Sequence, residues 1–202
     1  MTDRRNETPT WANVIKAAIE RRLDDINISL PARIESFDGV KASVQPLLQR
    51  KLVVGGAKIT LPIISNVPVL MPATANASVY LPLAKNDTGM LVFSQRSLDK
   101  WLVQGGLLTP DDPRKFSISD AQFIPGLKPF SKTTDYDADR LVVRNGDMMI
   151  TLKDDGKLKI SNSSGELLDK ISAMVDGLIG EPFVFNKAPL TLLKTLLASM
   201  KE

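Results

Sequence analysis

The hydrophobic pattern near the N-terminus has a helical period. Spacings of four, four and three residues separate the apolar Ile15, Ile19, Leu23 and Ile26. Residues spaced in this way lie on one face of a helix. Thr10 precedes them and is a suitable N-cap, so we predict a helix within residues 1–27. Its apolar face either packs on the protein's own domain or docks on a neighbouring subunit.

From residue 28 the pattern changes to the alternation of β-strands. Apolar and polar residues alternate in 31–37 and 40–45, and Asp38-Gly39 between them is a strong hairpin signal. Further short apolar segments follow, flanked by Gly and Pro: 52–54 and 59–61 around Gly55-Gly56, 67–71, 78–81 and 90–93. Residues 97–101 are suited to a short helix or turn. This density of short strands predicts a mainly β fold, with a small Greek-key barrel of the OB type over residues 28–102.

The segment 103–138 has a looser texture than the predicted barrel. It contains Gly105-Gly106, Pro110, Pro113 and Pro125-Gly126, with few apolar pairs between them. Long structureless loops inside one domain are uncommon. We therefore predict a loop-rich linker, which can still pack on the barrel, and place a domain boundary there.

Residues 139–163 contain three short predicted strands, with turns at Asn145-Gly146 and 154–156. Each strand has one apolar face, and together the faces comprise Leu141, Val143, Met148, Ile150, Leu152, Leu158 and Ile160. About 25 residues are too few for a core of their own. Three copies can bury these faces by interleaving into a short β-shaft, which also protects the strand edges. The alternative is a meander that packs on the barrel.

The C-terminal segment, residues 164–202, is predicted to be helical. Its first helix has the a/d spacing of a coiled coil at Leu167, Ile171, Met174 and Leu178. These four residues join the seven strand residues as predicted oligomerisation positions, although less than two heptads cannot hold chains together unaided. A second helix begins at Pro189, and its many leucines need to be covered by its own domain or by a partner.

Composition excludes several classes of function. The 202 residues include no Cys and no His, which removes disulfide scaffolds, thiol catalysis, Cys/His zinc sites and imidazole bases. The formal net charge is only +3, and the dense basic cluster of Arg4, Arg5, Arg21 and Arg22 is interleaved with acidic residues. No apolar run is long enough for a transmembrane helix, and no signal peptide is evident, so we expect folding in a cytoplasm.

Acidic clusters are the candidates for catalysis or ion binding. Asp154-Asp155-Gly156 is better explained as a turn. Asp135, Asp137 and Asp139 lack the Gly and the distal Glu of a calcium loop. We therefore expect no enzyme activity, no catalytic residue, no metal and no cofactor.

The order of these parts resembles a known family. Residues 91–101 combine an apolar strand with a short Leu-Asp-x-Trp turn, and residues 114–121 and 125–127 give a Ser-Asp-Ala segment that leads to a Pro-Gly. In these features the chain, over residues 28 to 130, resembles the central spike proteins of contractile-tail phage baseplates. In that family an OB-fold domain is followed by a trimeric β-helical shaft, and the ribbon 141–162 is similar to the start of such a shaft.

The resemblance implies a mechanical function. Spikes of this family are trimers on the tail axis that join the tube to the tip and pass through the host outer membrane when the sheath contracts. It implies a homotrimer in the tail baseplate of the virion, assembled in the host cytoplasm. Its implied partners are the baseplate hub and tail-tube proteins, a separate tip protein as a candidate at the C-terminal helices, and the host outer membrane only transiently. The family's His-x-His iron site is not carried over, because the chain has no His.

The alternative function is that of an OB-fold protein that binds single-stranded nucleic acid. Such binding requires solvent-facing aromatic residues beside Lys or Arg. Phe37, Tyr80 and Phe93 lie in apolar alternation, so we expect them in the core and expect no nucleic acid to bind.

Overall fold

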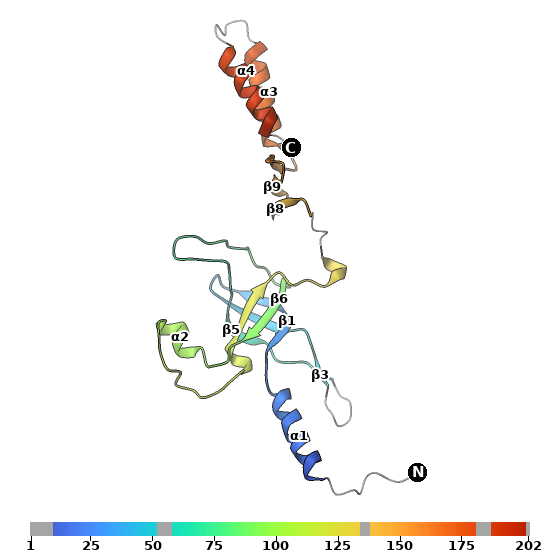
Figure 1. The fold of residues 1–202 in the computed structure, drawn as a ribbon, viewed down its shortest axis with the longest axis vertical. Coiled ribbons are helices and arrows are strands. Elements are labelled where there is room, and N and C mark those ends of the chain that lie inside the picture. Colours follow the sequence, from blue (N-terminus) through green and yellow to red (C-terminus); the bar gives the residue numbers. More distant parts are fainter. Residues whose placement is uncertain (1–9, 52–57, 134–137, 181–186, 201–202) are drawn as a thin grey trace, which may run out of the picture. The chain divides into compact units, whose positions relative to one another are not determined.

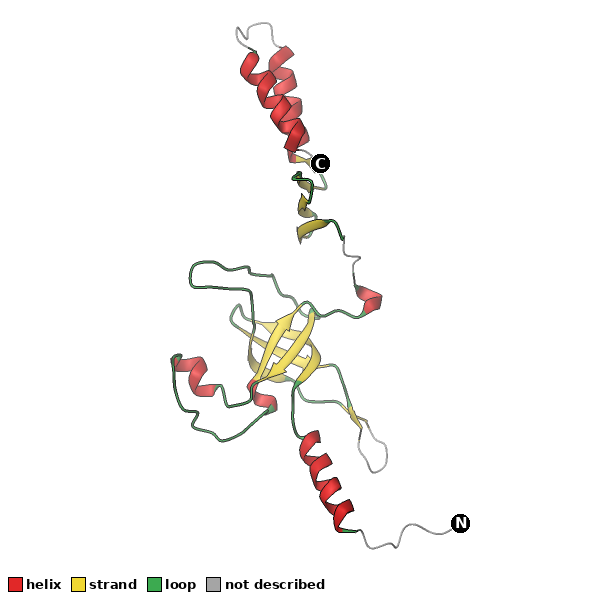
Figure 2. Cartoon of the chain, viewed as in Figure 1, coloured by secondary structure: helices red, strands yellow, loops and turns green. Residues whose placement is uncertain are grey.

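The structure is a computed structural model that describes residues 10–51, 58–133, 138–180 and 187–200 (Figure 1). The chain divides into two compact units, residues 1–133 and 134–202, and each is described here by itself. The first contains a β-barrel and an N-terminal helix, and the second a small sheet and two helices (Figure 2). The predicted mainly β fold is confirmed.

Five strands form the barrel sheet, in the order β5-β2-β1-β6-β7 with antiparallel neighbours. Their bounds are Ser29–Phe37 for β1, Lys41–Pro46 for β2, Ile64–Pro68 for β5, Thr88–Phe93 for β6 and Ala121–Pro125 for β7. The two ends of the sheet meet, because Val69 forms a parallel bridge with Phe123 and the Leu70 N–H donates to the Phe123 carbonyl at 2.8 Å. This closure agrees with the predicted OB-like barrel.

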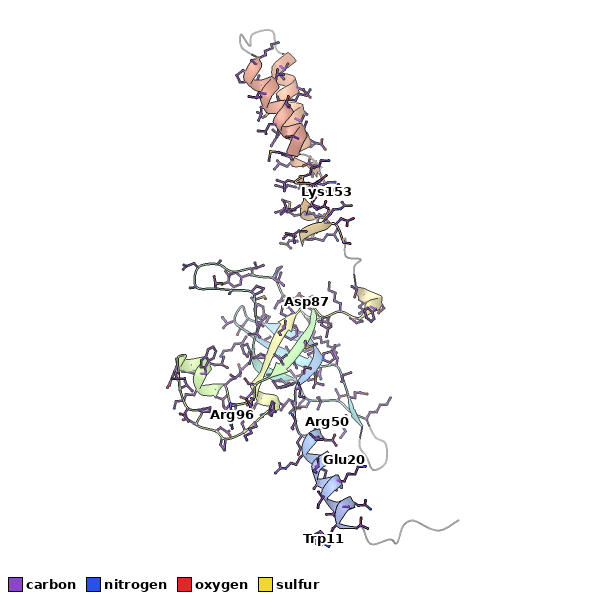
Figure 3. All side chains as sticks on the ribbon, in the orientation of Figure 1. Trp11, Glu20, Arg50, Asp87, Arg96 and Lys153 are labelled. Atoms are coloured by element: carbon purple, nitrogen blue, oxygen red, sulfur yellow. The ribbon has the colours of Figure 1, made fainter. Side chains whose placement is uncertain are left out.

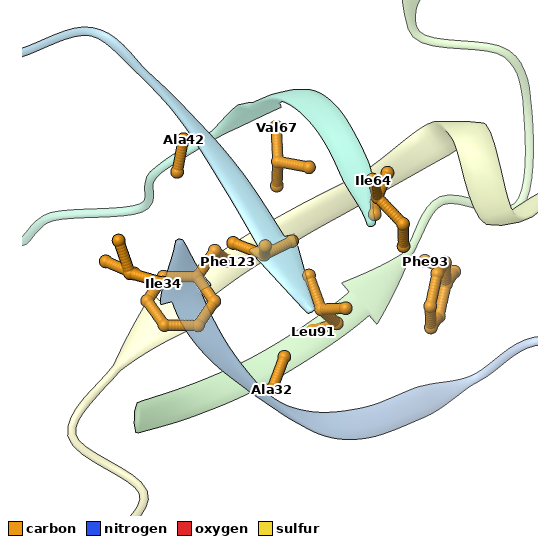
Figure 4. Packing of buried hydrophobic residues seen from close by; sticks show 10 residues of the cluster. Ala32, Ile34, Ala42, Ile64, Val67, Leu91, Phe93 and Phe123 are labelled. Carbon is orange, nitrogen blue, oxygen red and sulfur yellow. The ribbon is translucent and has the colours of Figure 1, made fainter. Parts of the chain in front are cut away.

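Alternate residues of β1, β2, β6 and β7, together with Ile64 and Val67 of β5, supply the barrel core (Figure 4). In β1, for example, Ala32 and Ile34 are buried whereas Arg33 and Glu35 are not. The complete core consists of Ala32, Ile34, Ala42, Val44, Ile64, Val67, Leu91, Phe93, Ala121 and Phe123. Apolar surface removed from water in this way is the main source of stability for such a domain.

Two glycines fit positions that other residues would strain. Gly39 has φ of 97° in the β1–β2 turn, where the Asp38 carboxylate accepts the N–H groups of Val40 and Lys41. Gly89 lies inside β6, and a Cβ there would stand 2.3 Å from the carbonyl oxygen of Ile124 and 2.5 Å from the Phe123 ring. The missing side chain therefore lets β6 and the ring of Phe123 pack closely.

Several predicted strands differ from the observed ones. β5 begins at Ile64, earlier than the predicted segment 67–71, because Ile64 as well as Val67 enters the core. The predicted strand 78–81 is wrong. Its backbone makes an isolated bridge between Ser78 and Ala73 and a hydrogen bond from the Val79 N–H to the Pro72 carbonyl, and Pro82, which has no N–H, follows it directly. Tyr80, expected in the core, is 78% exposed.

The predicted second hairpin is described at its base. β3, Arg50–Lys51, pairs with β4, Lys58–Ile59, in an antiparallel manner. The predicted strand 52–54 and the Gly55-Gly56 turn lie outside the described residues.

The segment 103–138 contributes to the barrel more than its loop-rich sequence suggested. It contains the short helix η2, Ile118–Asp120, the strand β7 and the short helix η3, Phe130–Lys132. The short helix predicted near residue 100 is present as α2, Asp99–Gln104. Phe123 of β7 is fully buried, so the barrel extends past residue 102 to include its last strand.

The N-terminal helix is α1, Trp11–Asp24, and Thr10 caps it through a hydrogen bond from the Asn13 N–H. No residue of α1 is buried, and its side chains project freely along the helix (Figure 3). Arg50 links its end to the barrel by donating to the Asp24 carbonyl and the Asn27 side chain. The helix therefore does not pack its apolar face on its own unit. Arg4 and Arg5 lie outside the described residues.

The second unit begins with a four-stranded antiparallel sheet in the order β11-β10-β9-β8. The strands are β8, Arg140–Asn145, β9, Met148–Lys153, β10, Leu158–Asn162, and β11, Gly165–Glu166. Two helices follow, α3, Leu167–Gly180, and α4, Ala188–Met200. The three predicted strands and both predicted helices are thus present. None of the described helices is long and apolar enough to span a membrane.

Candidate assembly interface

The seven apolar residues predicted in the ribbon lie on one face of the second sheet. Leu141 of β8 is opposite Leu152 of β9, which is opposite Leu158 of β10. In the next row Val143, Ile150 and Ile160 are opposite one another. Met148 completes the face in β9, because residues two apart in a strand point to the same side.

This face is largely open within its own unit. Leu141 is 62% exposed and Val143 59%, and Met148, Ile150 and Leu152 are exposed as well, whereas Leu158 and Ile160 are half-buried. The backbone pairing that creates the face is complete, so its openness does not come from a poorly formed sheet. A contiguous exposed apolar surface of this kind marks an interaction site in soluble proteins.

The opposite face of the same sheet is cationic. It carries Arg140 and Arg144 from β8, Lys153 from β9 and Lys159 from β10, by the alternation of the strands. Thr151 lies among them and is only 3% exposed. One face of the sheet is therefore apolar, whereas the other combines these cationic residues with Val142, Met149 and Thr151.

A pocket lies between the apolar face and α3. Its volume is about 260 Å³, and its lining includes Met148 and Ile160 of the sheet and Leu167 of α3. The Glu166 carboxylate accepts the N–H groups of Leu168 and Asp169, which fixes the start of α3 against β11. Apolar residues of the sheet and of α3 thus share one pocket, which Glu166 and Lys170 also line.

The four predicted a/d residues of α3 divide between two surroundings. Ile171 packs against the small core between α3 and α4, whereas Leu167, Met174 and Leu178 are exposed. The residues that hold the helices together are Leu168, Val175 and Ile179 of α3, with Leu190 and Leu197 of α4. The sequence prediction included the two leucines of α4 among those that need covering, but missed the three residues of α3. Their spacing along α3 is also helical, and each lies one residue after a residue of the predicted heptad.

A buried ion pair stabilises the long loop on the barrel. Asp120, 2% exposed, accepts two hydrogen bonds of 2.7 Å from the Arg114 guanidinium and one from the Leu98 N–H. Arg114 also donates to Asp99 and Asp112. Burial acts to raise the pKa of Asp120, but the bonds from Arg114 and Leu98 prevail and lower it. The bonds to Asp120 and then Asp99 raise the pKa of Arg114.

This network accounts for charged residues that could otherwise suggest chemistry. Every member of the Asp120 cluster has a structural partner, and Asp120 ties η2 to the start of α2. Among the residues that the structure describes, no group of three acidic side chains could hold a metal ion. Asp135 and Asp137 lie outside them. Asp155 accepts the Lys157 N–H in a turn between β9 and β10, which agrees with the predicted turn.

The barrel face that OB folds use for nucleic acid lacks stacking residues. Such proteins bind across the second and third strands of the barrel, which here are β2 and β5. The outward residues of these strands are Lys41, Ser43 and Gln45 in β2, and Ser65 and Asn66 in β5. Phe37 and Phe93 belong to the core or pack against it, as predicted. This composition offers no aromatic platform for bases.

Comparison with known families bears on the barrel. Residues 30–126 match the family model described as the phage protein Gp138 N-terminal domain. The barrel is similar to a phage protein domain. The match spans β1 to β7. It supports a structural role in a phage and a place in the virion, but it does not specify the predicted central spike. No curated protein matches the chain, and the matched region ends before the candidate interface begins.

Proposed function

We propose that the protein is a trimeric component of the phage tail baseplate, a central spike or a spike adaptor. In this role it links the tail tube and hub to the tip and acts in penetration of the host envelope. The match of residues 30–126 to a phage protein domain supports the setting. The observation that carries the proposal is the open apolar face of the sheet, from Leu141 to Ile160.

Three copies provide a direct way to cover this face. Each copy contributes two rows of three apolar residues at matching heights, and the cationic opposite face remains in water. The edge strand β8 also has one unpaired side in the single chain. Closed association around an axis covers such edges. A shaft built in this way has little loop area, which suits a part that is pushed through an envelope under load.

We expect the N-terminal end of the chain, with the barrel, to contact the hub, and α1 supplies a further contact. Its exposed apolar residues include Trp11, Ile15 and Leu23. A helix with an open apolar stripe and no packing on its own unit is suited to a neighbouring subunit or hub protein. We expect the hub and tail-tube proteins to bind at this end, and contact with the host outer membrane to be transient.

The experiment is the mass of the purified full chain in solution, measured by light scattering. We expect three times the mass of one chain, and a single-chain mass for the variant Ile150→Asp/Leu158→Asp, because two carboxylates per copy cannot be buried at the axis. The matched control is Val142→Asp/Met149→Asp, which places the same charges on the opposite face and leaves the trimer intact. A wild-type monomer, or a trimer that survives the first variant, contradicts the proposal.

A further inference from the structure

The two C-terminal helices form an antiparallel hairpin with a defined register. Asp176 of α3 binds Lys194 of α4, and near the turn the Lys187 ammonium donates to the Ile179 carbonyl. On the side of the Asp176–Lys194 pair away from the turn, Leu168, Val175 and Leu197 form a small core. This core uses only part of the apolar surface of each helix.

On α3 the unused part is a stripe. At about 3.6 residues a turn, Leu167, Met174 and Leu178 fall on one side of the helix, next to Ile171. All three are exposed, Met174 by 62%. On α4 the corresponding stripe consists of Leu193, Leu196 and Met200, with Leu192 at its edge, and all of these are exposed.

Both stripes lie on the same side of the hairpin. Each helix turns about its axis as the chain proceeds. In this sense of rotation, the exposed apolar stripe of each helix precedes the residues at the helix contact, Val175 in α3 and Leu197 in α4. Because the helices are antiparallel, this shared order brings both exposed stripes to one side of the pair. The hairpin therefore presents a single apolar face, made of two stripes.

This face contains no charged residue. Asp169, Asp176 and Lys194 lie outside both stripes, and Lys170 borders the α3 stripe in the pocket that Leu167 lines. In a symmetric assembly each side chain near the axis meets its own copies, so a charge there would face like charge. Docking surfaces for a different protein commonly use charges to select the partner. The absence of charge thus favours a second copy of this chain as the occupant.

The face also continues the apolar surface of the sheet. Leu167 belongs to the α3 stripe and lines the same pocket as Met148 and Ile160. If three sheets turn their apolar faces to an axis, the α3 stripe is carried to that axis by the short β11–α3 connection, in which Glu166 precedes Leu167 directly. Each helix is too short to hold chains together by itself. In this arrangement the sheet supplies the rest of the interface.

We propose that three α3–α4 hairpins pack their apolar faces together as a six-helix bundle that closes the C-terminal end of the trimeric sheet. This proposal rests on the trimer proposed above and deepens it. The end of the shaft is then a cap formed by the chain itself, and the C-terminal helices do not serve as a docking site for a separate tip protein.

Single cysteines test the proposal directly, because the chain has none of its own. Met174→Cys and Leu196→Cys each place a thiol on the apolar face, whereas Ala173→Cys and Thr195→Cys place one on adjacent, exposed residues outside it. Under mild oxidation of the full chain we expect a covalent dimer on a non-reducing gel from at least one of the first pair. We expect none from the control pair, since disulfides need Cα atoms within about 7 Å.

A charge variant separates this proposal from the trimer itself. In Met174→Lys/Leu196→Lys the sheet still holds three copies together, but the hairpins separate and protease cuts residues 164–200 faster than in Ala173→Lys/Thr195→Lys. A trimeric mass with neither cross-link nor change in proteolysis overturns the six-helix bundle, leaves the trimer standing and assigns the face to another protein. A wild-type monomer overturns both.

Discussion

Apolar and polar residues alternate along the strands of both the barrel and the second sheet, but the apolar residues are buried in the first and exposed in the second. In the barrel, Ile34, Leu91 and Phe123 are completely buried, because the sheet curls until its first and last strands meet over them. In the second sheet the equivalent positions, such as Leu141 and Val143, stay open to water. The difference lies in the number and length of the strands: five can close on themselves, whereas three strands of five or six residues and one of two cannot. One unit thus buries its alternating apolar residues within the chain, and the other leaves them exposed.

The largest expected effects come from truncating one residue of each unit to alanine. Phe123→Ala leaves a cavity in the closed barrel core and should lower its free energy of unfolding by about 3–5 kcal/mol, at any protein concentration. Ile150→Ala removes a side chain that is exposed in the single chain, so its cost should appear only through assembly. Urea titrations at two protein concentrations a hundredfold apart measure both effects.

The control for this comparison is Tyr80→Ala, which changes an exposed aromatic residue and should shift stability by less than about 0.5 kcal/mol. If Ile150→Ala destabilises the second unit equally at both concentrations, that unit buries the residue within one chain. The contrast between the two units would then be lost.

The extent to which sequence reasoning succeeded follows the same contrast. Local signals placed the Asp38-Gly39 turn, the Thr10 cap and the three strands of the second sheet, because each depends on neighbours in the chain. Alternation also assigned all seven apolar residues to one face, since a strand has a period of two whatever covers it.

The errors occurred where distant residues decide the outcome. The segment with Phe123 was expected to be a linker, because its five residues are flanked by turn residues and only pairing with β6 makes them a strand. Tyr80 was expected in the core, but its apolar neighbours have no strand to pair with. On α3 two overlapping helical spacings exist, and only the presence of α4 selects Val175 over Met174 for the helix contact.

The next effect in size is the loss of barrel stability at low pH. Since the pKa of Asp120 is lowered in the folded barrel, its ion pair contributes stability that is present above the ordinary value of 3.8 and is lost as the pH falls through the lower folded value. Arg114→Met should remove about 2–3 kcal/mol from the barrel near neutral pH, because it leaves the buried carboxylate without its cation.

Thermal unfolding between pH 7 and 3 measures this effect, with the barrel followed separately from the second unit by hydrogen exchange. Lys100→Met is the matched control, because its ion pair with the exposed Asp111 should contribute less than about 1 kcal/mol. If the wild type and Arg114→Met lose stability equally as the pH falls, carboxylates other than Asp120 determine the acid sensitivity of the barrel.

The smallest effects concern two glycines, one in each unit, that differ in the space around them. Gly89→Ala in β6 places a Cβ against the Ile124 carbonyl oxygen and the Phe123 ring, and should destabilise the barrel by about 1–3 kcal/mol through overpacking. Gly177→Ala in α3 meets nothing within 4 Å and should stabilise the helix by about 0.5–1 kcal/mol. Chemical denaturation of each variant measures both changes. If the six-helix bundle crowds this side of α3, Gly177→Ala no longer stabilises the assembled protein. It still stabilises the monomeric Ile150→Asp/Leu158→Asp variant. The same substitution therefore also reports how closely neighbouring hairpins approach.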